Sequence, residues 1–310
     1  MENRMFFTEI LSNSPLILSE CAVSERLGRM QGIELHPTLF NSPLIYNKAG
    51  RMALTKVYTE YREIASSAAL PIMLCAPTWR ADRFRIAEAN IPLSLVRDTI
   101  GFFNELKENW YNPNSPVITG ALIGPAYDCY DGSLAPKRKE AAEYHQWQIH
   151  EMATQNIDVI IAQTIPALPE ALSMADVLAT LDTPYILSFV INRHCQLPDN
   201  TMLGDAIQMI DQEIDVPPVG YMVNCVYPTF LRAEKHPSRI FPRLIGIQAN
   251  SSSLDHSQLD NATSLLRDPL DDWGKQMLLL NREWGVKILG GCCGTDDNYL
   301  RYLVEPPTSL

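Results

Sequence analysis

The chain has 310 residues, of which 46% are hydrophobic and 20% charged, and its formal net charge is −11. An acidic chain repels phosphate backbones, so nucleic acid is not expected as a partner. No apolar run reaches the roughly 18 residues that a membrane span needs, and residues 1–9 lack the apolar core of a secretory signal. We therefore expect a cytoplasmic protein that binds neither nucleic acid nor membrane. Its oligomeric state cannot be predicted.

Eight short apolar runs, each bounded by turn residues or by a switch to polar residues, are predicted as strands. Longer segments with helical spacing or polar character lie between them. The strands are expected at residues 16–18, 71–76, 116–123, 159–163, 185–191, 220–224, 244–248 and 286–290. The helices are expected at residues 52–67, 91–106, 137–155, 168–181, 202–214, 227–233 and 271–284, the last capped by Asp271 or Asp272.

Strands that alternate with helices are typical of parallel strands joined by right-handed crossovers. Eight such units favour a closed α/β barrel, a (β/α)8 TIM barrel, over an open sheet. No internal repeat or linker divides the sequence, so residues 1–310 are predicted to form one domain. In such barrels the chemistry lies where strands end and the following loops begin. The irregular segments 37–50 and 250–267 are candidate active-site loops.

Three of the seven cysteines follow predicted strands. Cys225 comes directly after one strand, and Cys292 and Cys293 follow closely on the last. Adjacent side chains of a regular strand point to opposite faces, but the glycines on both sides of the Cys-Cys pair permit a sharp turn. The two thiols and Cys225 could then converge on one metal ion.

Three thiolates are soft ligands that favour zinc over magnesium or calcium. No fourth cysteine or histidine is evident beside them, and a three-ligand site leaves a position open for a substrate thiol. Zinc ionises a bound thiol, and a thiolate can attack the methyl group of a sulfonium or quaternary ammonium donor. Two alternatives stay open: the cysteines are buried structural residues, or the pair forms a vicinal disulfide or redox couple.

Residues 220–225 (GYMVNC) and 290–295 (GGCCGT) together resemble the homocysteine S-methyltransferase family. The resemblance extends through residues 124–132, 161–171 and 249–251, and so covers nearly the whole chain. It implies a zinc-dependent (β/α)8 barrel that methylates homocysteine to methionine, with zinc on Cys225, Cys292 and Cys293. It also implies that Asn224 lies beside the site and that Thr164 belongs to the substrate pocket.

Two positions depart from the family pattern. Where the family has an Asp followed by glycine, this chain has Glu20, or Ser19 if the alignment slips by one residue. Where the family has Glu before Thr-Ile-Pro, this chain has Gln163. Both family carboxylates hold the amino group of homocysteine, whereas an amide carries no charge and bonds an ammonium more weakly. A different thiol acceptor, or an altered pose of homocysteine, is therefore an open hypothesis.

The predicted partners are a small-molecule thiol and a methyl donor, whose identity the sequence does not give. The alternatives are a non-catalytic zinc- or thiol-binding barrel and, less well supported by the ligand set, a zinc hydrolase. Trp79, Tyr127, Tyr130 and Tyr227 are candidates for an aromatic wall around a cationic donor. His194 follows the fifth strand and is the histidine best placed for the active-site face, whereas His145 and His150 are expected to be packed or solvated.

Overall fold

A computed structural model describes residues 2–236, 240–259 and 265–306. Its eight parallel strands close into a barrel in sequence order, with β1 paired to β8. The structure is a (β/α)8 TIM barrel that forms a single domain, as predicted. The strands are β1 (Ile17–Ser19), β2 (Ile72–Ala76), β3 (Val117–Ile123), β4 (Val159–Ile165), β5 (Tyr185–Phe189), β6 (Gly220–Val226), β7 (Leu244–Ala249) and β8 (Ile288–Gly291).

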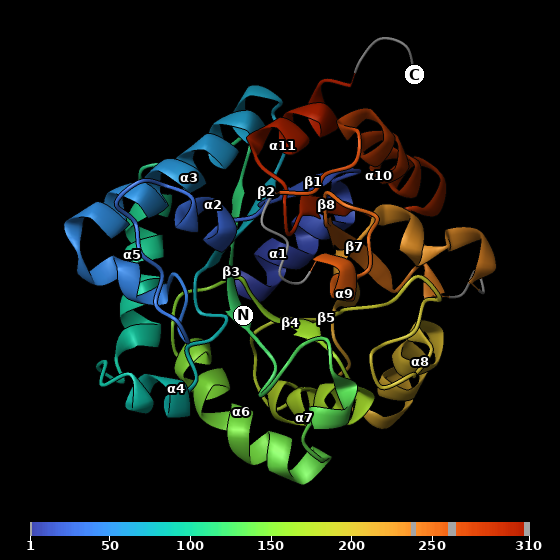
Figure 1. Cartoon of the computed structure of the whole chain (residues 1–310), viewed down its shortest axis with the longest axis horizontal. Coiled ribbons are helices and arrows are strands. Elements are labelled where there is room, and N and C mark those ends of the chain that lie inside the picture. Colours follow the sequence, from blue (N-terminus) through green and yellow to red (C-terminus); the bar gives the residue numbers. More distant parts are fainter. Residues whose placement is uncertain (1, 237–239, 260–264, 307–310) are drawn as a thin grey trace.

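Helices surround the barrel as an outer ring (Figure 1). The longer ones lie where the sequence predicted them, with ends shifted by a few residues: α3 (Lys48–Ser67), α5 (Leu95–Glu108), α6 (Arg138–Ala153), α7 (Leu168–Leu178), α8 (Leu203–Glu213) and α10 (Leu270–Trp284). Unpredicted helices are α1 (Glu2–Asn13), α2 (Ser24–Gly28), α4 (Arg83–Glu88), α9 (His256–Leu259), α11 (Asp297–Val304) and the short 3-10 helices η1 (Ser42–Tyr46) and η2 (Gly132–Leu134). No helix of the described ranges is both long and apolar enough to cross a bilayer.

Two local predictions were wrong. The segment 227–233 is not an α-helix but two 3-10 helices, η3 (Pro228–Leu231) and η4 (Ala233–Lys235), separated by Arg232 in the left-handed region at φ 44°. A residue there interrupts a right-handed helix. Neither Asp271 nor Asp272 caps α10, because the helix begins one residue earlier and its N-cap is Pro269. Both carboxylates lie in the first turn, where the helix dipole favours them.

The two ends of the barrel differ. Helix α1 lies across the N-terminal end, and Phe7, which is fully buried, packs in one cluster with barrel-interior residues such as Ile17, Met73 and Ile118. Lys287 donates from Nζ to the backbone oxygens of Leu11 and Ser12 at the end of α1. The N-terminal end is thus closed by packing, which leaves the C-terminal ends of the strands as the open face.

Candidate active site

The three predicted metal ligands meet at the open face of the barrel. Cys225 lies near the end of β6, and Cys292 and Cys293 follow β8 directly. The Sγ atom of Cys225 is 2.7 Å from that of Cys292, which is 4.0 Å from that of Cys293, and all three lie within 4.8 Å of one another. Hydrogen bonds from Cys292 and Cys293 hold the pKa of the Cys225 thiol well below its usual value. The hydrogen bond between Cys293 and Cys225 in turn raises the pKa of Cys293 to about 12.

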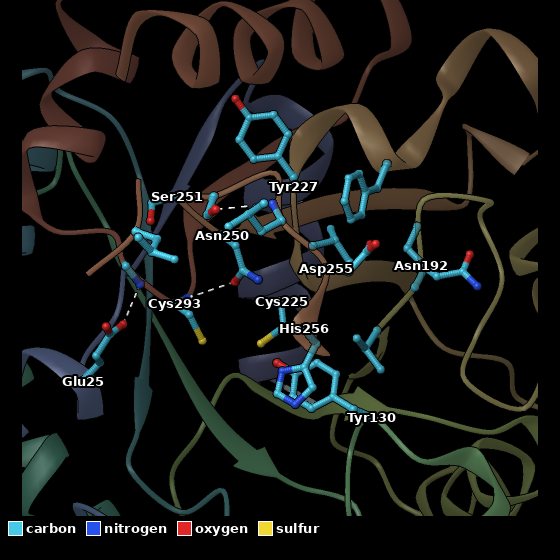
Figure 2. A pocket seen from close by; sticks show the side chains of 18 of the residues that line it. Glu25, Tyr130, Asn192, Cys225, Tyr227, Asn250, Ser251, Asp255, His256 and Cys293 are labelled. Atoms are coloured by element: carbon cyan, nitrogen blue, oxygen red, sulfur yellow. Dashed lines mark hydrogen bonds between the residues drawn. The ribbon is translucent and has the colours of Figure 1, made fainter. Parts of the chain in front are cut away.

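The turn that carries Cys292 and Cys293 is tied to three other elements. The Cys292 amide donates to the Ala249 carbonyl (2.8 Å) at the end of β7, and the Cys293 amide donates to Oδ1 of Asn250 (3.1 Å). The next amide, of Gly294, donates to Glu25 of α2 (2.5 Å), and Gly294 has φ +80°. Figure 2 shows Glu25 and Asn250 reaching the two sides of this turn. The left-handed glycine lets the chain reverse here, as predicted from the sequence.

Asn224 is fully buried and joins three strands beneath the sulfur cluster. Its Oδ1 accepts hydrogen bonds from the Thr164 amide (3.0 Å) and the Ser188 hydroxyl (2.7 Å). Its Nδ2 donates to Oγ1 of Thr164 (2.8 Å) and to Sγ of Cys225 (3.4 Å). Thr164 has φ +66° and Cys225 has φ +53°. A β-branched residue in that region is strained, so Asn224 holds an unfavourable backbone shape in place.

Glu20 and Gln163 line the same cavity as the cysteines but face different partners. Oε2 of Glu20 accepts the Cys75 amide of β2 (2.7 Å), and burial raises the pKa of this carboxyl from 4.5 to about 8. Nε2 of Gln163 donates to Oε1 of Gln248 (2.6 Å), whose own amide nitrogen donates to Oγ of Ser19 (3.0 Å). Glu20, Gln163 and Gln248 thus form one wall of the cavity, and at neutral pH this wall is largely uncharged. Gln248 was not predicted as a site residue, because its role depends on a side-chain hydrogen bond that crosses the barrel from β4 to β7.

Two neighbouring cavities open around the sulfur cluster. One, of about 630 Å³, contains all three cysteines, Glu20 and Gln163. The other, of about 730 Å³, touches Cys225 and Cys293 and extends toward Asn192 and Asp255. Tyr130 and His256 line both, with their rings stacked at a centroid distance of 3.4 Å and an angle of 11° (Figure 2). This aromatic pair therefore borders both cavities, and the sequence offered no signal that would join the two residues.

Of the aromatic residues and histidines considered from the sequence, some line the two cavities and others do not. Trp79, Tyr127 and Tyr130 line the 630 Å³ cavity, and Tyr227 lines the larger one, although only 6% of its surface is exposed. His194 is exposed in the loop after β5 and lines neither cavity, whereas His256 lines both. His145 is packed, with its Nε2 2.8 Å from the Glu170 carboxylate.

The predicted loop segments do border the site. Phe40 and Asn41 of the segment 37–50 line the 630 Å³ cavity. Residues 250–252, 254–256 and 265–266 of the second segment line the larger one, and residues 260–264 lie outside the described part of the chain.

The sulfur cluster has the size of a zinc site. With Zn–S bonds of about 2.3 Å, tetrahedral geometry places sulfur atoms roughly 3.8 Å apart. The observed separations of 2.7 and 4.0 Å bracket that value. Among the described residues no fourth cysteine, histidine or carboxylate joins this group. The three sulfurs therefore suit a soft ion with one position left for another ligand.

Comparisons with known proteins relate the whole chain to one family. The family model "Homocysteine S-methyltransferase" matches residues 18–306. The chain is 23% identical to homocysteine S-methyltransferase YbgG of Bacillus subtilis, covering 97% of both, and 22% identical to homocysteine S-methyltransferase 3 of Arabidopsis thaliana, covering 81% and 79%. The metallated form of the homocysteine methyltransferase MmuM from Escherichia coli has the same fold, with a TM-score of 0.74, 16% identity and coverage of 96% and 98%. The chain therefore belongs to the homocysteine S-methyltransferase family of methyltransferases.

Proposed function

We propose that this protein is a zinc-dependent thiol S-methyltransferase whose acceptor is homocysteine or a closely related thiol, with methionine as the product from homocysteine. The observation that supports it most directly is the convergence of Cys225, Cys292 and Cys293 at the open end of the barrel. The donor is proposed to be a small sulfonium or quaternary ammonium compound. After it gives up its methyl group, the rest of the donor departs as a neutral molecule, which makes it a good leaving group.

Zinc on the three sulfurs would keep a substrate thiol ionised at neutral pH. The acceptor sulfur then forms a bond to the methyl carbon, while the bond from that carbon to the donor breaks and its electrons stay on the donor. The protein's own part is to hold the two molecules in line, which lowers the entropic share of the barrier. Asn224 and Thr164 fix the end of β6 that carries Cys225, and the Tyr130–His256 pair borders both cavities from which reactants can approach.

The neutral wall around Gln163 favours a second version of this function, in which the acceptor is a thiol without an amino group. In the described residues Gln163 and Gln248 bond to each other, and the pKa of Glu20 is raised to about 8 by burial. A substrate ammonium would therefore meet amide and carboxylic acid groups. Neutral partners bond an ammonium more weakly than an ionised carboxylate does.

The test combines metal content with turnover. Reduced wild-type protein is expected to hold about one zinc per chain and to methylate homocysteine from at least one of S-methylmethionine, S-adenosylmethionine, betaine and dimethylsulfoniopropionate. Cys292→Ser should lose both properties. Cys195→Ser is the matched control, because Cys195 is buried away from the cluster and its thiol donates to the backbone oxygens of Phe230 and Leu231.

Each failure has a distinct meaning. Zinc binding without turnover on any donor and acceptor would leave a zinc- or thiol-binding barrel. Turnover with 3-mercaptopropionate but not with homocysteine would establish the amine-free acceptor. Absence of zinc from carefully reduced wild-type protein would refute the proposal.

A further inference from the structure

Arg80 occupies a place in the substrate cavity that the proposed chemistry does not use. It follows β2 in the loop to α4 and lines the 630 Å³ cavity together with the three cysteines. Its guanidinium carbon lies 4.7 Å from the ring centroid of Trp79 and 5.5 Å from that of Phe40. Trp79 is itself held, because its Nε1 donates to the Gln163 carbonyl (3.2 Å) and its carbonyl accepts the Gly124 amide (2.7 Å). The guanidinium thus rests on a fixed aromatic surface.

Arg80 has no hydrogen-bonded or ion-pair partner within the part of the chain that the structure describes. Its Nε is buried without a hydrogen bond, and no carboxylate lies within ion-pair distance. The other arginine that lines a cavity, Arg29, bonds the carboxylate of Glu25. A guanidinium carries five N–H donors and stays charged at all physiological pH values. Leaving the buried Nε donor unmatched is costly, and the guanidinium charge has no carboxylate partner, so the site favours an anion.

The acidic groups of this cavity are already used by the protein. Glu25 accepts the Gly294 amide and bonds Arg29, and Asp128 accepts the Tyr130 amide (2.8 Å). Glu20 accepts the Cys75 amide. None of these three carboxylates pairs with Arg80, so its guanidinium has no counter-charge among the residues described. The positive charge of Arg80 also repels a cationic methyl donor from the faces of Trp79 and Phe40. This argues against the role predicted for Trp79 in an aromatic wall around the donor.

We propose that Arg80 binds the carboxylate of a substrate in this cavity, and we assign that carboxylate to the acceptor thiol. The assignment rests on the proposed function, because it places the acceptor sulfur at the cysteine cluster. The cavity that holds Arg80 contains all three cysteines, whereas the larger cavity is not lined by Cys292. A planar guanidinium suits a carboxylate, which it can bond through two parallel N–H donors. The acceptor class is thus a mercapto-carboxylate, anchored by its acid group rather than by its amine.

The test measures binding to zinc-loaded protein by calorimetry. The probes are 3-mercaptopropionate and its neutral counterpart 3-mercaptopropanamide. Arg80→Gln is expected to raise the Kd of the acid about 10- to 100-fold and to leave that of the amide unchanged, while Arg80→Lys recovers part of the loss. Arg83→Gln is the matched control, because Arg83 is exposed three residues further on and lines neither cavity. Equal effects on acid and amide, or no effect on either, would overturn the proposal and leave Arg80 a packing residue.

Two further arms separate the sources of the carboxylate and the two proposals. If Arg80→Gln raises KM for dimethylsulfoniopropionate or betaine but leaves the Kd of 3-mercaptopropionate unchanged, the carboxylate belongs to the donor and the assignment to the acceptor is wrong. The thioether 3-(methylthio)propionate has no thiol to ionise, so its binding is expected to depend on Arg80 even in Cys292→Ser protein. That result would uphold Arg80 as a carboxylate site even if zinc binding or turnover failed.

Discussion

The substrate cavity has two walls that differ in chemistry. The wall formed by the ends of β6 and β8 carries three thiols, backbone in unusual conformations and a dense set of hydrogen bonds. The wall formed by β1, β4 and β7 carries Glu20, Gln163 and Gln248, which bond to one another's strands and present little charge. The motifs of the first wall are those that resemble the family in sequence, and the second wall carries the two departures, Glu20 and Gln163.

Under the proposed function, the reaction and the substrate specificity are carried by separate strands. A set of metal ligands tolerates little change, because ligand type and geometry select the ion. A wall that recognises the rest of a substrate can exchange a carboxylate for an amide and keep the fold, provided that each buried polar atom finds a partner. Gln163 and Gln248 meet that condition by bonding to each other.

The largest effect is expected on the sulfur wall. Zinc that binds the folded chain and not the unfolded chain stabilises it, by about 4 kcal/mol when free zinc exceeds its Kd 1,000-fold. Wild-type Tm should therefore rise on adding zinc to reduced apoprotein, and a chelator should reverse the rise. Differential scanning calorimetry measures both. Cys225→Ser should show little shift and Cys195→Ser the full one, so an equal shift in all three proteins would place the ion elsewhere.

On the other wall, Glu20 should make stability fall as pH rises. The pKa of this carboxyl is about 8 in the folded protein and near 4.5 when unperturbed, so between these values the unfolded chain has lost a proton that the folded chain retains. Unfolding then releases a proton, and the free energy of unfolding decreases through that window by an amount on the order of a few kcal/mol.

Glu20→Gln keeps an oxygen for the Cys75 amide and removes the titration. Urea unfolding of reduced, metal-free protein at pH 5 and pH 8 measures the difference between the two proteins. Wild type should lose more stability than Glu20→Gln over this interval. Parallel pH profiles would show that Glu20 is ionised in the folded state.

Asn224 links the two walls, and its removal should cost stability and zinc affinity together. Asn224→Ala leaves the Ser188 hydroxyl and the Thr164 amide without their acceptor. Each buried group left unpaired costs about 1–3 kcal/mol, so a loss of about 2–4 kcal/mol in unfolding free energy is expected. Asn109→Ala, at an exposed helix end, should change stability by less than about 0.5 kcal/mol. An Asn224→Ala protein as stable as wild type would show that the hydrogen bonds of Asn224 do not stabilise this part of the barrel.

The smallest effect is expected from restoring charge to the neutral wall. Gln163→Glu places a carboxylate where an ammonium would bind, and a charged bond exceeds a neutral one by about 1 kcal/mol. The preference for homocysteine over 3-mercaptopropionate should increase roughly fivefold to tenfold, as measured by competition for the same site. Gln146→Glu, an exposed change on α6, should leave the ratio unaltered. An unchanged ratio in Gln163→Glu would mean that the amino group does not approach this wall.

The sequence by itself determined the barrel and the three candidate metal ligands. Alternating strand and helix patterns specify a parallel sheet, and the rule that chemistry lies at strand ends places Cys225, Cys292 and Cys293 at one face. The glycines beside the Cys-Cys pair predicted a turn, and Gly294 in the left-handed region provides it. These features are local, because periodicity and turn chemistry act over a few residues.

Only the tertiary structure decided which distant side chains face one another. Three contacts join segments far apart in the chain: the hydrogen bond of Gln163 to Gln248, the stacking of Tyr130 on His256 and the contact of Arg80 with Phe40. The buried state of Glu20, which sets its charge, belongs with them. Burial and cross-barrel contacts depend on the closure of all eight strands, and no local pattern in the sequence records them.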